Sequence, residues 1–191
     1  MKEAASYRKT FQLSSLSRLK PVGSSGKRVI DIALAGFGIV LLSPLLLLCF
    51  AACRLSSPGP ALFGHLRIGF QGRYFRCLKF RTMVINGEEV LREYLASHPE
   101  ANAEWEATRK LRVDPRVTAM GSMLRKSGLD EIPQLFNVLR GEMSIIGPRP
   151  VTEEELAGYA TSAGSYLACR PGITGALLTE GQNLHATRWW A

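Results

Sequence analysis

The apolar positions of this chain gather in one long run, residues 32–53, which contains no charged side chain. At about 1.5 Å per residue, a helix over this range is long enough to cross a bilayer core of about 30 Å. Ser43 and Pro44 lie in its middle, and a proline has no N–H to donate to the carbonyl of Val40. The pattern therefore predicts an apolar helix that kinks or breaks at Ser43 and Pro44.

Both flanks of this apolar run are basic. Lys27 and Arg28 precede it, and no Asp or Glu occurs between Asp31 and Glu88. Because cytoplasmic loops collect Lys and Arg, a spanning helix should be basic on one side. A helix that enters, bends and returns to the same face explains two basic flanks, whereas a span with a tolerated proline kink explains the length equally well. The residues alone leave both topologies open. Asp31, one turn after Lys27 and Arg28, should be neutralised by one of them.

Shorter patterns follow the apolar run. Two β-prone segments around a turn at 69–72 predict a hairpin over residues 61–80. Period-2 alternation puts Lys79 and Arg81 on one face, where they form either a grip for a phosphate or a solvated basic edge. Helical periodicity then covers 88–98 and 99–111, and a further helix follows a turn at 114–118, with Asp114 as its expected cap.

An acidic pair opens the next helical pattern. Asp130 is expected as an N-cap, Pro133 is tolerated in a first turn, and Gly141 ends the helix. Ordinary capping accounts for this pair. The functional interpretation is that a carboxylate at a positive helix end stays ionised, which leaves it nucleophilic or able to bind a divalent cation. Arg125, about one turn earlier, would then hold an anionic substrate.

A proline lies on each side of Arg149, after a predicted strand at 143–146. Pro148, Arg149 and Pro150 suit either a phosphate clamp or a rigid surface loop. A capping box at Thr152 predicts a helix to about residue 167, and residues 170–175 are expected as a loop.

The net charge narrows the kinds of partner to be expected, and the cysteine content indicates the compartment. A net charge of +8 over 191 residues suits nucleic acid, anionic lipid or a phosphorylated substrate. The apolar run favours lipid and phosphate, and without zinc-finger spacing or a basic region with heptads we expect no nucleic-acid partner. The four cysteines form no C-x-x-C pair and are expected as reduced packing residues in a cytoplasmic protein: Cys49, Cys53, Cys77 and Cys169.

Several short motifs follow one another in a fixed order along the chain. They are Lys27-Arg28 with Asp31, Ser43-Pro44, Lys79-Phe80-Arg81-Thr82-Met83, Asp114-Pro115-Arg116, Leu129-Asp130-Glu131, Gly147-Pro148-Arg149-Pro150 and Arg170-Pro171-Gly172-Ile173-Thr174-Gly175. This order resembles a known family, the bacterial sugar transferases that begin exopolysaccharide, O-antigen and glycan synthesis, which are monotopic polyprenyl-phosphate phosphoglycosyl transferases. The segment 64–83 looks most like those members that transfer galactose or glucose 1-phosphate.

The resemblance implies an α+β, mainly helical fold. It comprises a flexible basic segment (1–26), a re-entrant membrane helix-break-helix (27–55) broken at Ser43 and Pro44, a cytoplasmic catalytic domain with a β-hairpin (56–175) and an atypical tail (176–191). It further implies that Asp130 is the nucleophile, Glu131 its partner, and both are ligands of Mg²⁺. The residues expected to bind substrate phosphates are Lys79, Arg81, Arg125, Pro148, Arg149 and Pro150.

The implied reaction transfers a sugar 1-phosphate from UDP-galactose or UDP-glucose to undecaprenyl phosphate, through a covalent phospho-sugar intermediate on Asp130 and with release of UMP. It takes place at the cytoplasmic face of the bacterial inner membrane. The identity of the sugar and the formation of a homodimer stay open. Residues 176–191 depart from the family's Trp-Gln…Gly-Arg-Asn segment and look like a frameshifted or truncated end. The alternative is therefore a catalytically impaired homologue that acts as a membrane scaffold or regulator.

Overall fold

The computed structural model describes residues 21–159 and 162–175 and divides into two compact units. Unit 1 takes in the described residues of 1–35, 66–76 and 137–191, and unit 2 takes in 36–65 and 77–136. The predicted tail at 176–191 and most of the basic segment at 1–26 lie outside the described residues. The elements in chain order are α3 (Ser25–Ser56), β1 (Leu62–Ile68), η1 (Phe70–Gly72), β2 (Tyr74–Phe80), α4 (Gly87–Ser97), α5 (Pro99–Thr108), α6 (Ala119–Ser127), η2 (Leu129–Glu131), α7 (Gln134–Arg140), β3 (Ser144–Ile146), α8 (Glu153–Ala157), α9 (Ala163–Leu167) and β4 (Gly172–Thr174).

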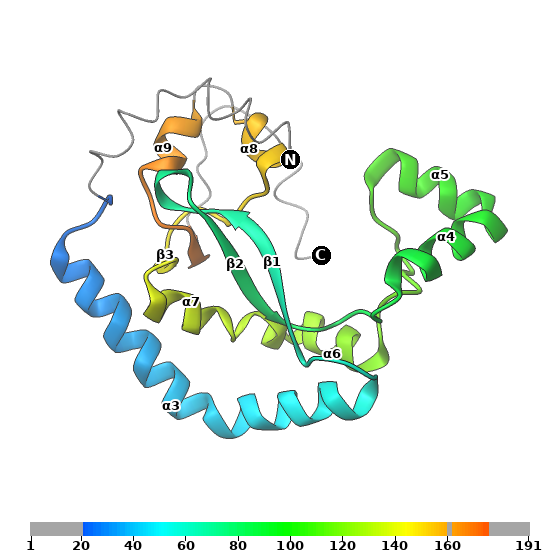
Figure 1. Ribbon diagram of the computed structural model, residues 1–191, viewed down its shortest axis with the longest axis horizontal. Helices are drawn as coiled ribbons and strands as arrows, with labels where there is room; N and C mark the ends of the chain where they lie inside the picture. The colour runs from blue at the N-terminus through cyan, green and yellow to red at the C-terminus, as the bar shows by residue number, and fades with distance from the viewer. Residues whose placement is uncertain (1–20, 160–161, 176–191) are drawn as a thin grey trace. The chain divides into compact units, whose positions relative to one another are not determined.

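The apolar run forms a single helix. α3 is 32 residues long with Pro44 inside it, and its ribbon is uninterrupted (Figure 1). The predicted break at Ser43 and Pro44 is therefore absent, whereas the ribbon bends near the middle of the helix, in line with the predicted kink (Figure 1). The reason is local: the Ser43 hydroxyl donates a hydrogen bond of 2.8 Å to the carbonyl of Val40, the acceptor that Pro44 cannot serve. A side-chain donor next to the proline thus satisfies the freed carbonyl.

Most of α3 is exposed. Within the described residues one helix, α3, is long and apolar enough to cross a membrane, and only 11 % of its most apolar stretch is buried. Phe37, Val40 and Leu47 are 67 %, 73 % and 70 % exposed. A core helix of a soluble domain would be mostly buried, so this surface is suited to lipid or to another apolar partner.

The predicted hairpin over 61–80 is confirmed. β1 and β2 form a two-stranded sheet, and Gly69 N–H donates to the carbonyl of Arg73 at 2.8 Å across the turn. In β2 the burial alternates at first, with Phe75 and Cys77 buried. The alternation is then lost, because the next buried residue is Phe80, three positions after Cys77, and it packs into the core of unit 2.

The core of unit 2 includes the second half of α3. Cys49 and Cys53 pack there with Phe80 of β2 and Leu124 of α6, and Leu129 packs against them from the edge. α6 is capped by Thr118, whose hydroxyl accepts from Gly121 N–H at 2.9 Å. The expectation that Asp114 caps this helix was wrong, because its carboxylate accepts hydrogen bonds from Arg116 instead.

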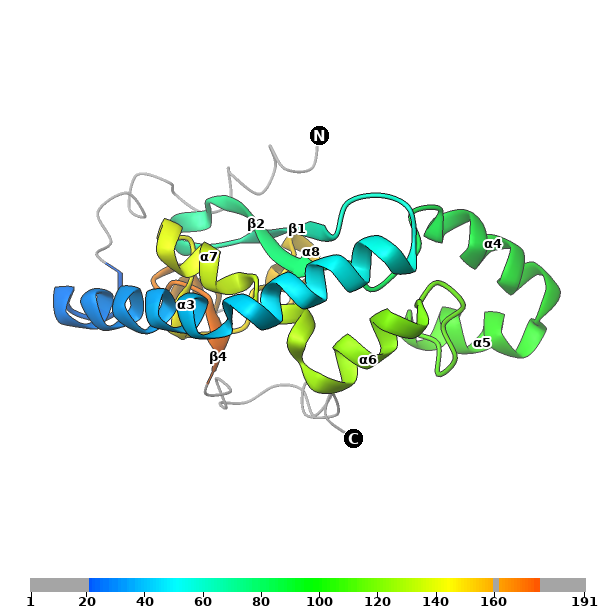
Figure 2. The same ribbon diagram turned by 90° about the horizontal axis from the view of Figure 1, so that it is seen from below.

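α4 and α5 lie against each other as a helical hairpin in unit 2 (Figure 2). Their bounds agree with the predicted helices at 88–98 and 99–111 to within a few residues. The Arg116 guanidinium lies over the Trp105 ring of α5, with the guanidinium carbon 5.0 Å from the ring centroid. This contact joins the hairpin to the loop that precedes α6.

The acidic pair occupies a tighter turn than expected. Gly128, at φ +69°, ends α6, and Asp130 and Glu131 then lie in the 3-10 helix η2. Asp130 is therefore not the N-cap of a helix running to Gly141, which was the prediction. α7 begins only at Gln134, after Pro133, and it ends at the predicted Gly141, whose φ is +83°.

Unit 1 is built around Tyr166. Its ring is fully buried, and its hydroxyl donates to the carbonyl of Ile68 at 2.7 Å and accepts from Val151 N–H at 3.2 Å. The capping box at Thr152 is confirmed, but two short helices, α8 and α9, occupy the range where one helix was expected. The predicted loop at 170–175 contains β4, which pairs in parallel with β3.

Candidate active site

The acidic pair of η2 lies beside two cations of unit 2. Asp130 is 8 % exposed, whereas the Glu131 side chain is 38 % exposed and its Oε1 lies 2.5 Å from the Nζ of Lys79. The second cation, Arg125, lies in the last turn of α6. One carboxyl is thus sheltered, and its neighbour is half-exposed and paired.

Burial raises the pKa of Asp130 above its ordinary value, and the charge of Glu131 adds to this effect. The positive charges of Lys79 and Arg125 oppose the rise. We expected a carboxylate held ionised by a helix end, but the carboxyl lies in a short 3-10 turn and burial outweighs the nearby cations. Any further cation at this position would favour the ionised, nucleophilic form.

Arg125 is oriented by a residue that the sequence interpretation missed. Its Nε donates to the hydroxyl of Thr82 at 2.8 Å, and Thr82 is 7 % exposed. Thr82 directly follows β2, which supplies Lys79. The sequence does contain a signal for Thr82, because this residue belongs to the motif from Lys79 to Met83. Only the charged residues of that motif, Lys79 and Arg81, were expected to bind phosphate.

Gly121 allows α6 to approach this segment. A Cβ at Gly121 would lie 2.0 Å from the carbonyl oxygen of Thr82, far inside contact distance. Thr118 N–H donates to the same carbonyl at 3.1 Å. The absence of a side chain at Gly121 therefore allows α6, which supplies Arg125, to lie close to Thr82.

A second carboxylate, Asp114, acts on the same arginine at a distance. It accepts from Arg116 Nε and Nη2 at 2.8 and 2.7 Å. Burial tends to raise the pKa of Asp114, but its hydrogen bonds with Arg116, together with the positive charge of Arg125, lower it below its usual range. Asp114 thus stays ionised in the field of Arg125.

Arg81 lies where α3 ends. Its Nη2 donates to the carbonyls of Ser57 and Cys53 at 2.7 and 3.3 Å, and its Nη1 donates to the carbonyl of Pro58. These carbonyls belong to the last turn of the helix and the residues after it, which lack partners in the helix. In the structure Arg81 therefore stabilises the end of α3, while the side chain of Lys79 pairs with Glu131.

The donor set of the acidic pair fits a magnesium ion. Mg²⁺ is usually held by one or two carboxylates and completes its shell with water and substrate phosphates. Asp130 and Glu131 supply two carboxylates on neighbouring residues. Among the described residues no group of three or more His, Cys, Asp and Glu side chains is gathered for a metal. Water and substrate phosphates would therefore supply the remaining ligands of the ion.

The predicted clamp at Pro148, Arg149 and Pro150 belongs to unit 1 and follows β3. The carbonyl of Pro148 accepts from Gly172 N–H at 2.8 Å, which fixes the start of this loop against β4. Arg149 is exposed. The structure thus brings Asp130, Glu131, Lys79 and Arg125 together in one unit and holds the clamp in the other.

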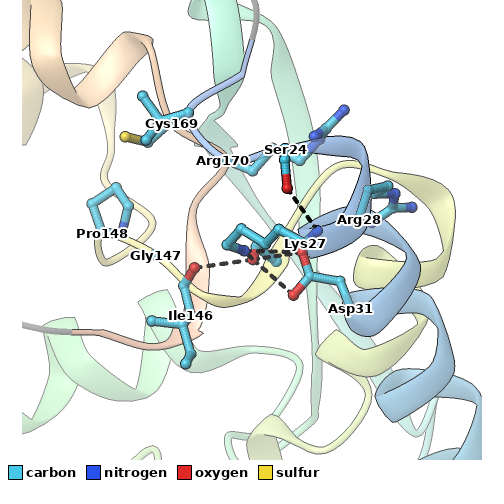
Figure 3. A pocket seen from close by; sticks show the side chains of 12 residues that line it. Ser24, Lys27, Arg28, Asp31, Ile146, Gly147, Pro148, Cys169 and Arg170 are labelled. Carbon is cyan, nitrogen blue, oxygen red and sulfur yellow. Dashed lines mark hydrogen bonds and ion pairs between the residues drawn. The ribbon is translucent and has the colours of Figure 1, made fainter.

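Unit 1 contains a second polar cluster where α3 begins (Figure 3). Asp31 is 5 % exposed and pairs with Lys27 Nζ at 3.0 Å, as expected. Asp31 also accepts from the Ser144 hydroxyl at 2.9 and 3.0 Å and from Ile145 N–H at 3.1 Å. This carboxylate therefore ties the first turns of α3 to β3.

The chain matches the bacterial sugar transferase family over residues 22–190 and belongs to it. It is 51 % identical over 172 residues to the exopolysaccharide production protein ExoY of Sinorhizobium fredii, which covers 89 % of this chain and 76 % of that protein. It is 48 % identical to the undecaprenyl-phosphate galactose phosphotransferase of Salmonella typhimurium, covering 82 % of this chain and 33 % of that protein.

A third relative is the UDP-glucose:undecaprenyl-phosphate glucose-1-phosphate transferase of Caulobacter vibrioides. It is 41 % identical over 81 % of this chain and 54 % of its own length. The chain thus spans about three quarters of ExoY but a third to a half of the other two relatives. Membership of this family makes the chain a transferase enzyme, and the family match includes most of the tail that looked atypical.

Proposed function

We propose that this protein transfers a sugar 1-phosphate from UDP-galactose or UDP-glucose to undecaprenyl phosphate at the cytoplasmic face of the bacterial inner membrane. The observation that carries the proposal is the sheltered Asp130 with Glu131, Lys79 and Arg125 around it in one unit. Two relatives named for undecaprenyl-phosphate sugar transfer support the choice of substrates.

In the first step the Asp130 carboxylate attacks the β-phosphorus of the UDP-sugar. The bond from that phosphorus to the bridging oxygen breaks, and UMP leaves with the bonding electrons. The sugar phosphate is then held on Asp130 as an acyl phosphate, a mixed anhydride of the carboxyl group. In the second step an oxygen of the lipid phosphate attacks the same phosphorus, the Asp130 carboxylate leaves, and the lipid diphosphate sugar is released.

The chain's own cations make an anion-on-anion attack feasible. Lys79 and Arg125 place positive charge beside Asp130, where a diphosphate would add negative charge. Asp130 and Glu131 are the residues that would hold Mg²⁺, which when bound neutralises phosphate charge and favours the ionised form of Asp130. Thr82 keeps Arg125 in place for this role.

The way the site is built supports a location at the membrane. Leu129, next to Asp130, packs against the core that includes Cys49 and Cys53 of α3. The acidic pair is thus attached to the helix whose exposed apolar surface suits lipid. We propose that α3 is re-entrant rather than spanning, so that a soluble nucleotide sugar and a lipid phosphate reach the same side.

The test is transfer of radiolabelled sugar phosphate from UDP-galactose and UDP-glucose to undecaprenyl phosphate by the purified chain. Asp130→Asn should lower turnover by roughly 10³-fold or more, because the nucleophile is lost. Arg92→Gln, an exposed substitution in α4, serves as the control and should retain activity. Mass spectrometry after incubation with UDP-sugar should find one sugar-phosphate adduct in wild type and none in Asp130→Asn.

Unchanged turnover in Asp130→Asn would remove the nucleophile assignment. A wild-type chain that folds, shows no adduct and releases no UMP would instead favour the impaired scaffold or regulator.

A further inference from the structure

A small pocket opens in unit 1 beside the first turns of α3. Its volume is about 160 Å³, and its lining comes from the start of α3, from the end of β3 with the loop after it, and from Cys169 and Arg170 (Figure 3). Sites for drug-sized ligands are usually roughly 300–1,000 Å³. A pocket of this size therefore suits a small group, such as a headgroup whose remainder lies outside.

The lining of this pocket has an excess of positive charge. Its charged residues are Lys27, Arg28 and Arg170 against the single carboxylate of Asp31. That carboxylate is already engaged, because it pairs with Lys27 and accepts from Ser144 and Ile145. The two arginines are left without a carboxylate within ion-pair distance among the described residues.

The two guanidinium groups are only partly satisfied by the fold. Arg28 Nη2 donates to the carbonyl of Leu139 at 3.3 Å, and Arg170 Nε donates to the carbonyl of Gly141 at 2.9 Å. These contacts stabilise the carboxyl end of α7. However, the buried Arg28 Nη1 has no hydrogen-bond partner among the described residues. Burial lowers the pKa of Arg170, and the nearby positive charge of Arg28 lowers it further, against the opposite effect of Asp31.

The surroundings indicate that the missing anion arrives on a lipid. Ile146 lines the pocket and is 60 % exposed, and Val22 lines it and is 64 % exposed. Immediately after Arg28, Val29 and Ile30 begin the exposed apolar surface of α3. Cations next to exposed apolar side chains are arranged for a ligand with a phosphate at one end and hydrocarbon at the other.

We propose that this pocket, formed by Lys27, Arg28, Ile146 and Arg170, binds the phosphate headgroup of an anionic membrane lipid. The headgroup offsets the charge that Asp31 leaves uncompensated, and the acyl or polyprenyl chain follows the apolar surface of α3. The source of the phosphate is either an anionic phospholipid or undecaprenyl phosphate. The inference does not depend on the chemistry of Asp130, so lipid binding and sugar transfer can fail separately.

The test is native mass spectrometry of the detergent-purified full chain, titrated separately with phosphatidylglycerol, phosphatidylcholine and undecaprenyl phosphate. Wild type should retain at least one of the two anionic lipids roughly tenfold more tightly than phosphatidylcholine. The double variant Arg28→Gln, Arg170→Gln should lose roughly tenfold in affinity for that lipid, since it loses two charge-assisted contacts. The charge-matched control Arg92→Gln, Lys126→Gln alters exposed residues of unit 2 and should change affinity less than twofold.

A second pair of variants covers the case in which the double variant does not fold, as judged by its thermal unfolding. Ile146→Glu puts a carboxylate at the exposed rim and leaves both arginine contacts intact, so it should weaken binding of the anionic lipid severalfold. Ile146→Gln should not. Preference for undecaprenyl phosphate or for phosphatidylglycerol identifies the source, and either result supports the proposal.

The proposal is overturned if wild type retains the anionic lipids no better than phosphatidylcholine, or if Ile146→Glu binds them as wild type does. It is also overturned if millimolar inorganic phosphate displaces the lipid completely, because the ligand would then be a free phosphate.

Discussion

Thr82 and Arg125 show how much of the proposed site depends on one neutral side chain. The Thr82 hydroxyl accepts from Arg125 Nε at 2.8 Å, and Thr82→Val removes this acceptor with little change of shape. We expect kcat/KM for sugar transfer to fall roughly tenfold, since a hydrogen bond to a charged group is worth about 1.5–3 kcal/mol. Thr82→Ser keeps the hydroxyl and should recover most of the activity. A serine variant as poor as the valine variant would show that packing, not the hydroxyl, matters.

The ionised form of the Asp130 carboxyl should destabilise the folded protein. Its pKa is raised on folding by burial, so its contribution to stability is fully present below the unfolded pKa of about 3.9 and is lost as pH rises through the folded value. Asp130→Asn should therefore unfold at a higher temperature than wild type at pH 7, and the difference should shrink as the pH approaches 4. Thermal unfolding in detergent at several pH values measures this.

For Asp114→Asn we expect the opposite change in stability at pH 7, a loss instead of a gain. The pKa of Asp114 is lowered on folding by its bonds with Arg116, which outweigh burial. Its contribution is present above the unfolded pKa and is lost as pH falls through the folded value. The asparagine variant should be about 1–3 kcal/mol less stable than wild type at pH 7, because it loses charge-assisted hydrogen bonds. Equal shifts in both variants would contradict the two assignments.

At the scale of elements, the packing of α6 on the end of β2 depends on Gly121. A methyl group there would lie 2.0 Å from the carbonyl oxygen of Thr82. Because that atom belongs to the backbone, Gly121→Ala should cost about 1–3 kcal/mol and lower the transfer rate by displacing Arg125. Gly164→Ala in α9 meets nothing within 4 Å and should be neutral or slightly stabilising. Chemical denaturation of both variants, read beside activity, checks this.

Local patterns predicted most of the elements. Short-range preferences that the fold keeps account for the hairpin at 61–80, the helices α4 and α5, the capping box at Thr152 and the end of α7 at Gly141. β4 could not be predicted, because its parallel pairing with β3 joins segments far apart in the sequence. The continuity of α3 through Pro44 depends on one rotamer of Ser43, which a residue pattern does not specify.

The candidate site was predictable in its residue types and less so in its contacts. Asp130, Glu131, Lys79 and Arg125 were singled out from the sequence, and the structure gathers them in unit 2. The sequence pattern puts Arg81 on the same strand face as Lys79, but in the structure β2 ends at Phe80 and the Arg81 guanidinium donates to the carbonyls at the end of α3. Alternation gives the side of a strand on which a residue lies, but the partner depends on which chain segment passes there.

At the scale of the whole molecule, the proposed re-entrant topology of α3 can be tested by cysteine labelling. Single cysteines at Ser24 and Ser57, in a chain whose four native cysteines are changed to serine, lie before and after the helix. If α3 is re-entrant, a membrane-impermeant maleimide should label both positions in inside-out vesicles and neither in intact spheroplasts. A spanning helix would give labelling of one position in each preparation. Transfer activity of each cysteine variant confirms that the protein remains folded.

α3 contributes structure to both units. Asp31 ties its first turns to β3 in unit 1, and Cys49 and Cys53 lie in the hydrophobic core of unit 2. The segment is therefore not a removable anchor. Efforts to make a water-soluble version for crystallisation should keep the buried side chains of α3 and change only its exposed apolar side chains, since deletion of the helix would remove part of the core of unit 2.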